Sequence, residues 1–381
     1  MTSLIKHKRV EFTELFFDLV FVYAISKTTS LIHHLHHGML EWNAFSAFLF
    51  SLIVLVNIWM VQTVFTNRYG KNSLFNMLVT FICMGLLLFV SNMMVSDWYP
   101  YFHPFSRAIA LLSVTQFVQY LVEYKKSSSS PEDKQLIRSF LVATGVRTVF
   151  TGLAGFLPLN LGLPFYIIGI LLTWVSPLFV RGRLETVPIN FPHLIERISL
   201  LVIITFGEMI MGIAAYFTPE TFSVNSILYL AIVCLLFLYY FTEFDHAIDE
   251  SNQANETFLI YSHYPVFMGL IMITVGLTFV SQAEANHLFS TLFLYAGLAL
   301  FIFAIHANSR HNKAHLIFPL SYIVLDVVLF ALMLGVSLVF RENATAVLSV
   351  TALFLLGLFI HFILFYIQRE NQEDGFGWEL Y

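Results

Sequence analysis

The sequence predicts an all-α protein that crosses a lipid bilayer about twelve times. Of its 381 residues, 58% are hydrophobic and only 11% are charged, whereas soluble domains carry about 25% charged residues. The mean hydropathy is +0.78. The apolar residues also gather into segments that reach the roughly 20 residues a membrane-spanning helix requires. Together these observations indicate a polytopic membrane protein whose main partner is the lipid bilayer.

The apolar segments form two sets of six. The first six are expected at 11–34, 42–66, 73–95, 102–124, 134–157 and 162–180. The second six are expected at 194–217, 223–244, 257–281, 287–308, 314–340 and 344–368. We therefore expect a first six-helix half over residues 1–185, a second over 186–370, and a short tail over 371–381.

The basic residues predict the orientation of these helices. Of the 19 Lys and Arg residues, 15 fall at one set of helix ends, and the exceptions are Lys27, Arg107, Arg147 and Arg341. Cytoplasmic loops carry the excess of such residues. Both termini are therefore expected in the cytoplasm, with the chain in the plasma membrane. The two halves then begin on the same side, so that they would form a parallel repeat.

Three acids share one face of the first expected helix. Glu11, Glu14 and Asp18 follow the spacing i, i+3 and i+7, which aligns them on one side of a helix. An ionisable group in hydrocarbon costs from about 2.5 to more than 10 kcal/mol, so it usually faces a bundle interior, a partner or a water-filled path. Asp18 lies about 10 Å beyond Glu11 at 1.5 Å per residue. It is our first candidate for an intramembrane polar site.

The seventh expected helix carries a second polar track. Glu208 lies deep in its apolar run, eleven residues after Arg197, and we assign it to the same intramembrane site as Asp18. The cytoplasmic mouth of a path to this site is expected to comprise Glu14, His193, Glu196 and Arg197. The alternative is structural, with the acids paired to Arg147, or to Asn and Gln donors, to hold the bundle together.

Two further charges are expected near the middle of the bundle. Arg147 and Asp326 occupy the fifth and the eleventh expected helices. Because an unpaired Arg is costly at that depth, we expect Arg147 to have a carboxylate partner. The sequence leaves open whether that partner is Asp326, Asp18 or Glu208. A static ion pair is as compatible with the sequence as an ion pair that opens during gating.

Other polar residues at helix ends complete the candidate set: Asn67, Arg68, Glu243, Asp245 and His263. The sequence leaves open which of Glu243 and Asp245 matters. A cluster of His33, His34, His36 and His37 follows the first helix, and His binds Zn²⁺ and similar metals. Because only Glu41 adds a further ligand nearby, we favour a solvated loop and expect no metal.

Several function classes are not indicated. The sequence contains no phosphate-binding glycine loop, no catalytic-triad order and no metalloprotease His-Glu pair, so no cofactor is expected. It also contains no long basic stripe of the kind that binds nucleic acid.

Two of these segments resemble a known family. Glu14-Leu15-Phe16-Phe17-Asp18-Leu19-Val20-Phe21-Val22 is similar to the signature opening of the bacterial low-temperature-requirement A family. His193-Leu194-Ile195-Glu196-Arg197, followed by Gly207-Glu208, resembles its second signature, and Asn67-Arg68 and His263 with Pro265 also resemble it. The resemblance covers essentially the whole chain and implies a multipass bacterial membrane protein. The family name describes growth in the cold and not a chemical activity.

A second, more distant likeness concerns the opening of the chain. The expected arrangement has two sets of six helices, with Arg9 and Asp18 at the start of the first helix. This arrangement is similar to that of the lysosomal potassium channel family.

The leading hypothesis is a transporter or channel-like permease for an ion or a small solute. Asp18 and Glu208 would carry protons if transport is proton-coupled, because a buried carboxyl can load and unload a proton near neutral pH. One alternative is an intramembrane enzyme acting on a lipid or isoprenoid, with the carboxylates and His263 as acid and base. Another is a non-transporting helper required for growth in the cold. The oligomeric state is left open.

Overall fold

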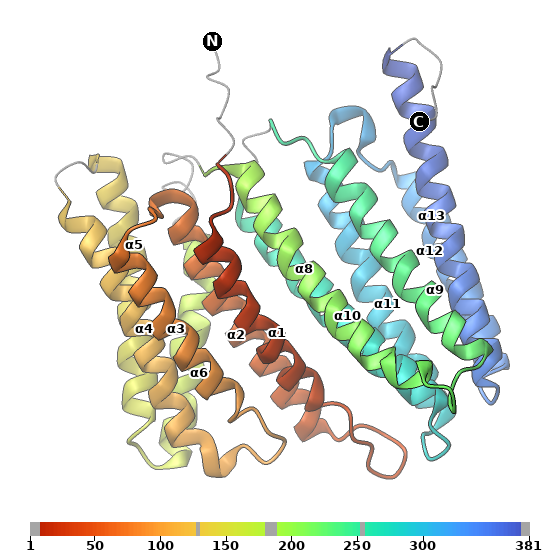
Figure 1. The fold of residues 1–381 in the computed structure, drawn as a ribbon, viewed down its shortest axis with the longest axis horizontal. Coiled ribbons are helices and arrows are strands. Elements are labelled where there is room, and N and C mark those ends of the chain that lie inside the picture. The colour runs from red at the N-terminus through yellow and green to blue at the C-terminus, as the bar shows by residue number, and fades with distance from the viewer. Residues whose placement is uncertain (1–7, 127–129, 180–188, 252–255, 375–381) are drawn as a thin grey trace. The chain divides into compact units, whose positions relative to one another are not determined.

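The computed structural model describes residues 8–126, 130–179, 189–251 and 256–374. Within these ranges the chain forms twelve α-helices and no β-strand, which confirms the predicted all-helical fold (Figure 1). Eleven of these helices are long and apolar enough to cross a membrane. The remaining helix, α1, has 19 residues but carries the charged side chains of Glu14, Asp18 and Lys27.

The chain divides into two compact units. Unit 1 comprises Met1–His34, Trp42–Leu201 and Gln253–Tyr261, and unit 2 comprises Leu35–Glu41, Val202–Asn252 and Ser262–Tyr381. Unit 1 contains α1 (Phe12–Ser30), α2 (Trp42–Tyr69), α3 (Leu74–Ser91), α4 (Phe102–Lys125), α5 (Pro131–Ala154), α6 (Leu159–Phe179) and the first part of α8 (Phe191–Ala214). Unit 2 contains the rest of α8, α9 (Val224–Phe241), most of α10 (Glu256–Ser281), α11 (His287–Asn308), α12 (Leu320–Val339) and α13 (Ala344–Asp374).

Short helical turns border several of these helices. They are η1 (Tyr99–Tyr101), η2 (Ala215–Phe217), η3 (Thr242–Ala247), η4 (Ser309–His311) and η5 (Ala314–Leu316). The turn η3 is π-helical and directly continues α9. Such π-helical turns are rare and often occur at functional sites.

Two helices begin at or after a proline and differ there from the expected boundaries. Helix α5 begins at Pro131 instead of 134, because Ser130 and Asp133 form a capping box and a proline is tolerated in the first turn. Helix α12 begins at Leu320 instead of 314, because residues 314–316 form the separate turn η5 and Pro319 precedes the helix.

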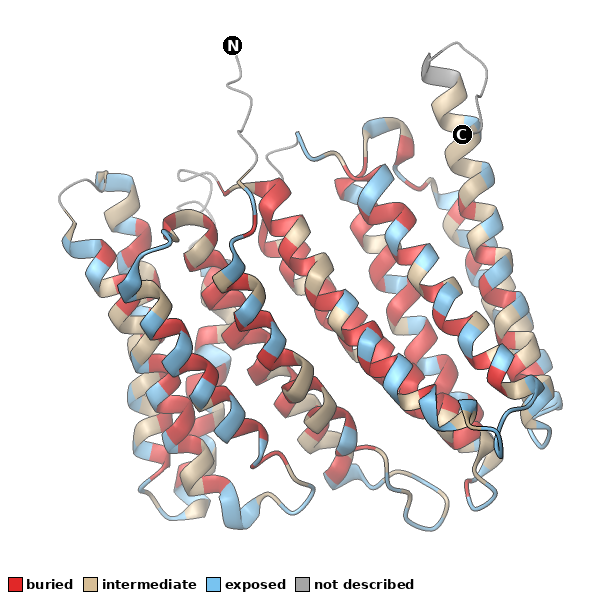
Figure 2. Ribbon diagram, viewed as in Figure 1, coloured by how far each residue is buried: buried red, intermediate tan, exposed pale blue. Residues whose placement is uncertain are grey.

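The helices of unit 1 pack around α2. Helix α4 packs against α5 and α3, α5 against α6, and α1 against both α3 and α2. Most of α2 is buried, as the red ribbon shows (Figure 2), and its buried residues include Asn57 and Trp59. Helix α6 instead exposes large apolar side chains such as Leu171 and Leu172. Exposed apolar surface of this kind is what a helix presents to hydrocarbon.

Unit 2 has its own core. Helix α9 packs against α13, and α12 packs against α13 and α11. Helix α11 is largely buried, whereas α12 exposes much of its apolar surface, including Val327 and Leu332. Helices α10 and α11 approach closely where Gly269 meets Gly297, since a Cβ atom on Gly269 would lie 2.7 Å from the Gly297 carbonyl oxygen. Small residues allow helix backbones to come this close in a membrane.

The close contact between Gly269 and Gly297 predicts the effect of adding one methyl group at Gly269. Gly269→Ala should lower the unfolding temperature of the detergent-solubilised protein, because overpacking a tight contact typically costs about 1–3 kcal/mol. Gly335→Ala is the matched control, since no described atom lies within 4 Å of its would-be Cβ atom. The control should keep or raise the unfolding temperature, because Ala favours a helix over Gly. Equal melting of both variants and the parent would contradict the close α10–α11 contact.

Candidate functional site

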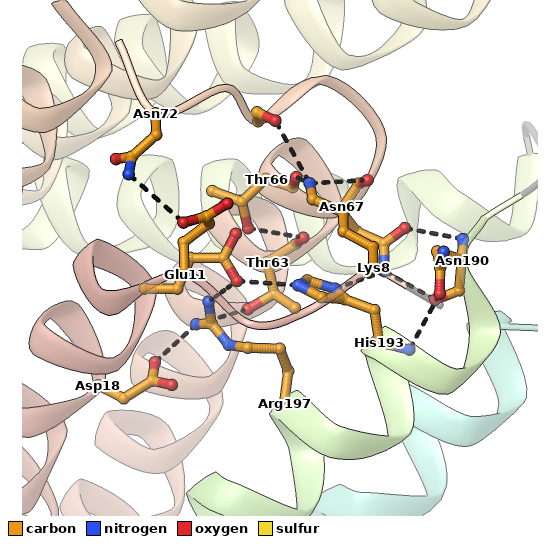
Figure 3. A network of polar contacts seen from close by, with 12 residues as sticks. Lys8, Glu11, Asp18, Thr63, Thr66, Asn67, Asn72, Asn190, His193 and Arg197 are labelled. Carbon is orange, nitrogen blue, oxygen red and sulfur yellow. Dashed lines mark hydrogen bonds and ion pairs between the residues drawn. The ribbon is translucent and has the colours of Figure 1, made fainter. Parts of the chain in front are cut away.

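Charged side chains from α1 and α8 meet inside unit 1. Glu14 and Asp18 are four residues apart on α1, and His193 and Arg197 are four residues apart on α8, so each pair occupies one face of its helix. All four side chains are buried. The two faces meet, and the four side chains form one network, most of which is labelled in Figure 3.

The guanidinium of Arg197 joins both carboxylates. Its Nη1 donates to Glu14 Oε2 at 2.9 Å and its Nη2 donates to Asp18 Oδ1 at 2.7 Å. Glu14 Oε2 also lies 3.0 Å from His193 Nε2. Breaking a buried pair of this kind by removing one partner typically costs about 3–5 kcal/mol. The network therefore fastens α1 to α8 strongly.

Helix α2 completes the site from a third side. Trp59 Nε1 donates to Asp18 Oδ1 at 2.9 Å, and the guanidinium carbon of Arg197 lies 5.7 Å from the Trp59 ring centroid. One turn later, Thr63 Oγ1 accepts a long bond of 3.5 Å from Arg197 Nη2. Because Trp59, Thr63 and Asn67 recur every four residues, they share the face of α2 that meets the network.

Hydrogen bonds define the protonation of His193. The backbone N–H of Asn190 donates to Asn67 Oδ1 at 2.9 Å. Because only the oxygen of a side-chain amide can accept this bond, the orientation of the Asn67 amide is fixed and its nitrogen points the other way. That nitrogen donates to the Asn190 carbonyl and lies 3.0 Å from His193 Nδ1. Nδ1 is then the acceptor, and the ring proton sits on Nε2 and is donated to Glu14. His193 is therefore neutral in this arrangement.

The network then carries more negative than positive charge. Glu14 and Asp18 are two carboxylates, and Arg197 is the guanidinium between them. Asp18 Oδ2 is buried and has no hydrogen-bond partner among the described residues. A proton on this oxygen would balance the charge, because Asp18 Oδ1 is already occupied by Trp59 and Arg197.

A small polar pocket of about 40 Å³ lies beside this network in unit 1. Arg197 and Glu14 line its inner wall, together with the buried amides of Gln62 and Gln119. Both amide atoms of each glutamine lack a partner within the described part of the chain. Buried amides normally have partners, and a pocket of this size has room for a water molecule.

The pocket leads toward exposed residues at one end of the unit. Its outer wall includes Glu11, Lys71 and Asn72, all of which are exposed. Asn72 Nδ2 donates to Glu11 Oε2 at 3.4 Å (Figure 3). The geometry thus places a polar opening next to the buried Arg197–Glu14 pair.

Lys8 stabilises the end of α2 at this opening. Its Nζ donates to the carbonyl oxygens of Thr66, Asn67 and Gly70 at 2.5, 3.3 and 3.3 Å. A cation suits this position, because the last carbonyls of a helix are unsatisfied and carry partial negative charge. Burial lowers the pKa of the Lys8 ammonium, while Glu14 and Glu11 oppose that shift.

Arg147 has hydrogen-bond partners that the sequence did not predict. Its guanidinium is fully buried and donates to Ser113 Oγ at 2.6 Å, to Asn57 Oδ1 at 2.7 Å and to Gln116 Oε1. These three partners from α2 and α4 are neutral, and a carboxylate partner for Arg147 stays a prediction. Asp18, one of the expected partners, instead pairs with Arg197.

The remaining candidates of unit 1 lie apart from the four-residue network. Arg68 Nη2 binds both carboxylate oxygens of Glu256, each at 2.6 Å, where α2 ends and α10 begins. Glu196 is half-buried on α8, one residue before Arg197.

Unit 2 contains the other expected site residues. Glu208 is buried on α8. Asp326 lies between two histidines, with His306 Nε2 at 2.9 Å and His361 Nδ1 at 2.7 Å. His263 Nε2 lies 3.1 Å from the hydroxyl of Tyr240.

The two acids that follow α9 differ in exposure. Glu243 is fully buried, whereas Asp245 is exposed and lies 3.5 Å from the side chain of its neighbour His246. Of the pair that the sequence left open, Glu243 is the one in the interior.

The histidine-rich segment forms a turn. His36 and Met39 bridge to each other through their backbones, and His37 and Gly38 have positive φ angles of 51° and 77°. Nowhere in the described ranges do three or more His, Cys, Asp or Glu side chains form a group suited to a metal ion. Burial and the neighbouring His34 lower the pKa of His33.

Sequence reasoning missed the direct pairing between α1 and α8. We placed Arg197 at the mouth of a path and Asp18 inside it, without joining them. The sequence contained a pattern that indicates this pairing. An acidic pair on one helix and a basic pair on another, both with a four-residue spacing, can bind each other when the two helices lie face to face. Trp59, Gln62 and Gln119 carried no such signal, because isolated polar residues in apolar helices do not reveal which face is buried.

Comparison with known proteins gives one match. The family model described as "Bacterial low temperature requirement A protein (LtrA)" matches residues 9–365, which is nearly the whole chain. A search of curated proteins found no match.

The network predicts how stability responds when its cation is removed. Arg197→Met should destabilise the protein by about 3–5 kcal/mol, because two buried carboxylates lose their shared partner. Adding Asp18→Asn to this variant should recover part of the loss, since one uncompensated charge is removed. Thermal unfolding in detergent measures both effects.

Arg138→Met is the matched control for that comparison. Arg138 is exposed on α5, so its replacement should change stability little. Full additivity of Arg197→Met and Asp18→Asn would show that the two side chains do not interact.

Proposed function

We propose that this chain, which belongs to the bacterial low temperature requirement A family, is a proton-coupled permease for an ion or small solute. The main support for this proposal is that the buried network contains more negative than positive charge. Two carboxylates face one guanidinium, His193 is neutral, and Asp18 Oδ2 has no partner in the described residues. A proton on Asp18 relieves that imbalance, so the site is suited to load and release one proton.

The polar pocket supports a route for this proton. It joins the exposed residues Glu11 and Asn72 to the buried Glu14 and Arg197. Water in a pocket of about 40 Å³ would hydrogen-bond the free amides of Gln62 and Gln119. A proton entering from this end would reach Glu14 first and Asp18, one turn deeper on α1, second.

Protonation of Asp18 would change the packing of α1 on α8. The ionised carboxylate holds Arg197 through a short, charge-assisted bond of 2.7 Å. A neutral Asp18 holds it more weakly, and Arg197 then stays bound to Glu14 alone. Coupled transport requires an element whose two packings bind the proton with different affinity. The α1–α8 contact is that element in our proposal.

Glu208 is the second carrier in this proposal. It is buried on α8, eleven residues beyond Arg197. Acids this deep in an apolar helix usually serve ion or proton paths. Glu196, one residue before Arg197 on α8, stays a predicted residue of the cytoplasmic mouth.

We further propose that the protein is a plasma-membrane permease made of two parallel six-helix halves, 1–185 and 186–370, with both termini cytoplasmic. The distribution of Lys and Arg supports the orientation. A shared pattern supports the repeat. The fifth helix of each half carries one buried charge, Arg147 or Asp326, and that residue bonds to the fourth helix through Gln116 or His306.

Proton flux into liposomes tests this function. Wild-type protein, reconstituted with a trapped pH dye and an imposed inside-negative potential, should acidify the lumen faster than protein-free vesicles. Asp18→Asn and Glu208→Gln should reduce this rate at least tenfold, because a neutral amide cannot exchange a proton. Both variants keep the size of the original side chain.

Glu132→Gln is the matched control, because Glu132 is exposed at the start of α5 and does not line the pocket. It should retain most of the flux. Wild-type vesicles no faster than protein-free ones would contradict proton movement through this protein. Full flux in Asp18→Asn would remove Asp18 from the path.

A further inference from the structure

A second pocket lies at the other end of unit 1. It has a volume of about 210 Å³ and is lined by the N-terminal parts of α2, α4 and α6 and by residues that follow α3. The polar pocket described above lies where α2 ends, since Thr66 and Gly70 line it. The proposed function uses the polar pocket alone. The second pocket, which we call the aromatic pocket, has no role in it.

The wall of the aromatic pocket is rich in rings. Its aromatic lining residues are Phe50, Trp98, Phe102, Phe105 and Tyr166. The centroid of the Tyr166 ring lies 5.5 Å from that of Phe50 and 5.9 Å from that of Phe102. Phe105 lies 6.0 Å from Tyr166, and Trp98 lies 5.8 Å from Phe102. These separations are those of favourable aromatic pairs, so the rings form one connected group.

Tyr166 also brings an unpaired polar group to this wall. Its side chain is fully buried, and its hydroxyl has no hydrogen-bond partner among the described residues. Buried polar groups nearly always have a partner, so this exception requires an explanation. The nearby Ser46 hydroxyl, which also lines the pocket, donates to the Asn43 carbonyl oxygen at 2.9 Å. A ligand with an acceptor oxygen would supply the partner that Tyr166 lacks.

The volume of the aromatic pocket limits what it can hold. An apolar cavity of about 150 Å³ holds one benzene molecule, whereas pockets for drug-sized ligands begin at about 300 Å³. The aromatic pocket lies between these sizes, so it fits one ring with a small substituent. It is not sealed, since Ala47, Val95 and Leu163 in its lining are only half-buried.

A ring suits this wall better than a flexible chain or a charged molecule does. Contacts between rings stabilise a complex beyond the effect of the area they bury, and the sulfur atoms of Met93 and Met94 in the lining also favour aromatic neighbours. A hydrocarbon chain makes no ring contacts and loses rotational freedom when it is held. A charged molecule would lose its hydration, because the described lining residues include no charged side chain.

We propose that the aromatic pocket binds a small molecule with one planar six-membered ring and one carbonyl oxygen. The ring packs among Phe50, Phe102 and Phe105, and the carbonyl oxygen accepts a hydrogen bond from the Tyr166 hydroxyl. The molecule is either free in solution or is the ring of a lipid-soluble compound whose tail leaves through the open side of the pocket.

Tryptophan fluorescence of the purified full-length chain in detergent tests this site, because Trp98 lines the pocket. Acetophenone, which has one ring and one carbonyl, should quench the fluorescence saturably. Ethylbenzene lacks the acceptor oxygen and should compete about three- to tenfold less well, which is the value of one hydrogen bond. Methyl hexyl ketone lacks the ring and should also compete less well than acetophenone.

Tyr166→Phe removes only the hydroxyl. It should weaken acetophenone binding by the same factor of about three to ten and leave ethylbenzene binding unchanged. Ala47→Phe should abolish saturable quenching, because the new ring fills the pocket. Tyr322→Phe is the matched control, since Tyr322 is a buried tyrosine of unit 2 that does not line the pocket. It should bind acetophenone as the wild type does.

Quenching that rises linearly with acetophenone, or methyl hexyl ketone that competes as well as acetophenone, would overturn the ring site. Equal acetophenone affinity of the wild type and Tyr166→Phe would overturn the hydrogen bond. Gel filtration and thermal unfolding check that each variant is folded. If Tyr166→Phe does not fold, the wild-type preference for acetophenone over ethylbenzene tests the hydrogen bond by itself.

A decyl chain on the para carbon of acetophenone distinguishes the two sources of the ring. Tighter binding of the decyl compound at the same detergent concentration assigns the site to a lipid-soluble compound, and weaker binding assigns it to a free one. Ligand binding is measured without transport, so a silent flux assay would reject the permease and keep the aromatic site.

Discussion

The bond between Arg197 and the two acids of α1 is the constraint on which unit 1 depends. A helix with two carboxylates, such as α1, is unstable in hydrocarbon unless those charges are paired. Arg197 supplies the pair, and it can do so only if α8 presents the correct face to α1. Trp59 and Thr63 then fill the remaining hydrogen-bonding positions from α2. Three helices are therefore oriented about their own axes by one guanidinium.

Other buried charged side chains also have hydrogen-bond partners, but of different kinds. Arg147 donates hydrogen bonds to neutral oxygens from α2 and α4. Asp326 is satisfied by two imidazoles, and Glu243 only by an amide. Each buried charged group thus has a different set of hydrogen-bond partners, drawn from different helices.

Candidate residues could be predicted because hydrocarbon makes any ionisable side chain conspicuous. Asp18, Glu208, Arg147 and Asp326 stand out from apolar runs, and all four are buried. Their partners could not be predicted in the same way. The hydroxyl and amide oxygens that bind Arg147, for example, are too common in membrane helices to attract notice. The choice between Glu243 and Asp245 depended on the π-helical turn, which changes the direction of successive side chains.

The sequence by itself determined that the chain is helical and membrane-spanning, because about 20 apolar residues in a row have no other stable arrangement in a bilayer. It also determined where most helices begin and end, since prolines, caps and polar loops interrupt the apolar runs. Only the tertiary structure decided which face of α1 meets which face of α8, that His193 is neutral, and that Gln62 and Gln119 line a pocket. Those facts depend on the rotation of each helix about its axis, and that rotation is set by packing and by pairing of buried polar groups between segments far apart in sequence.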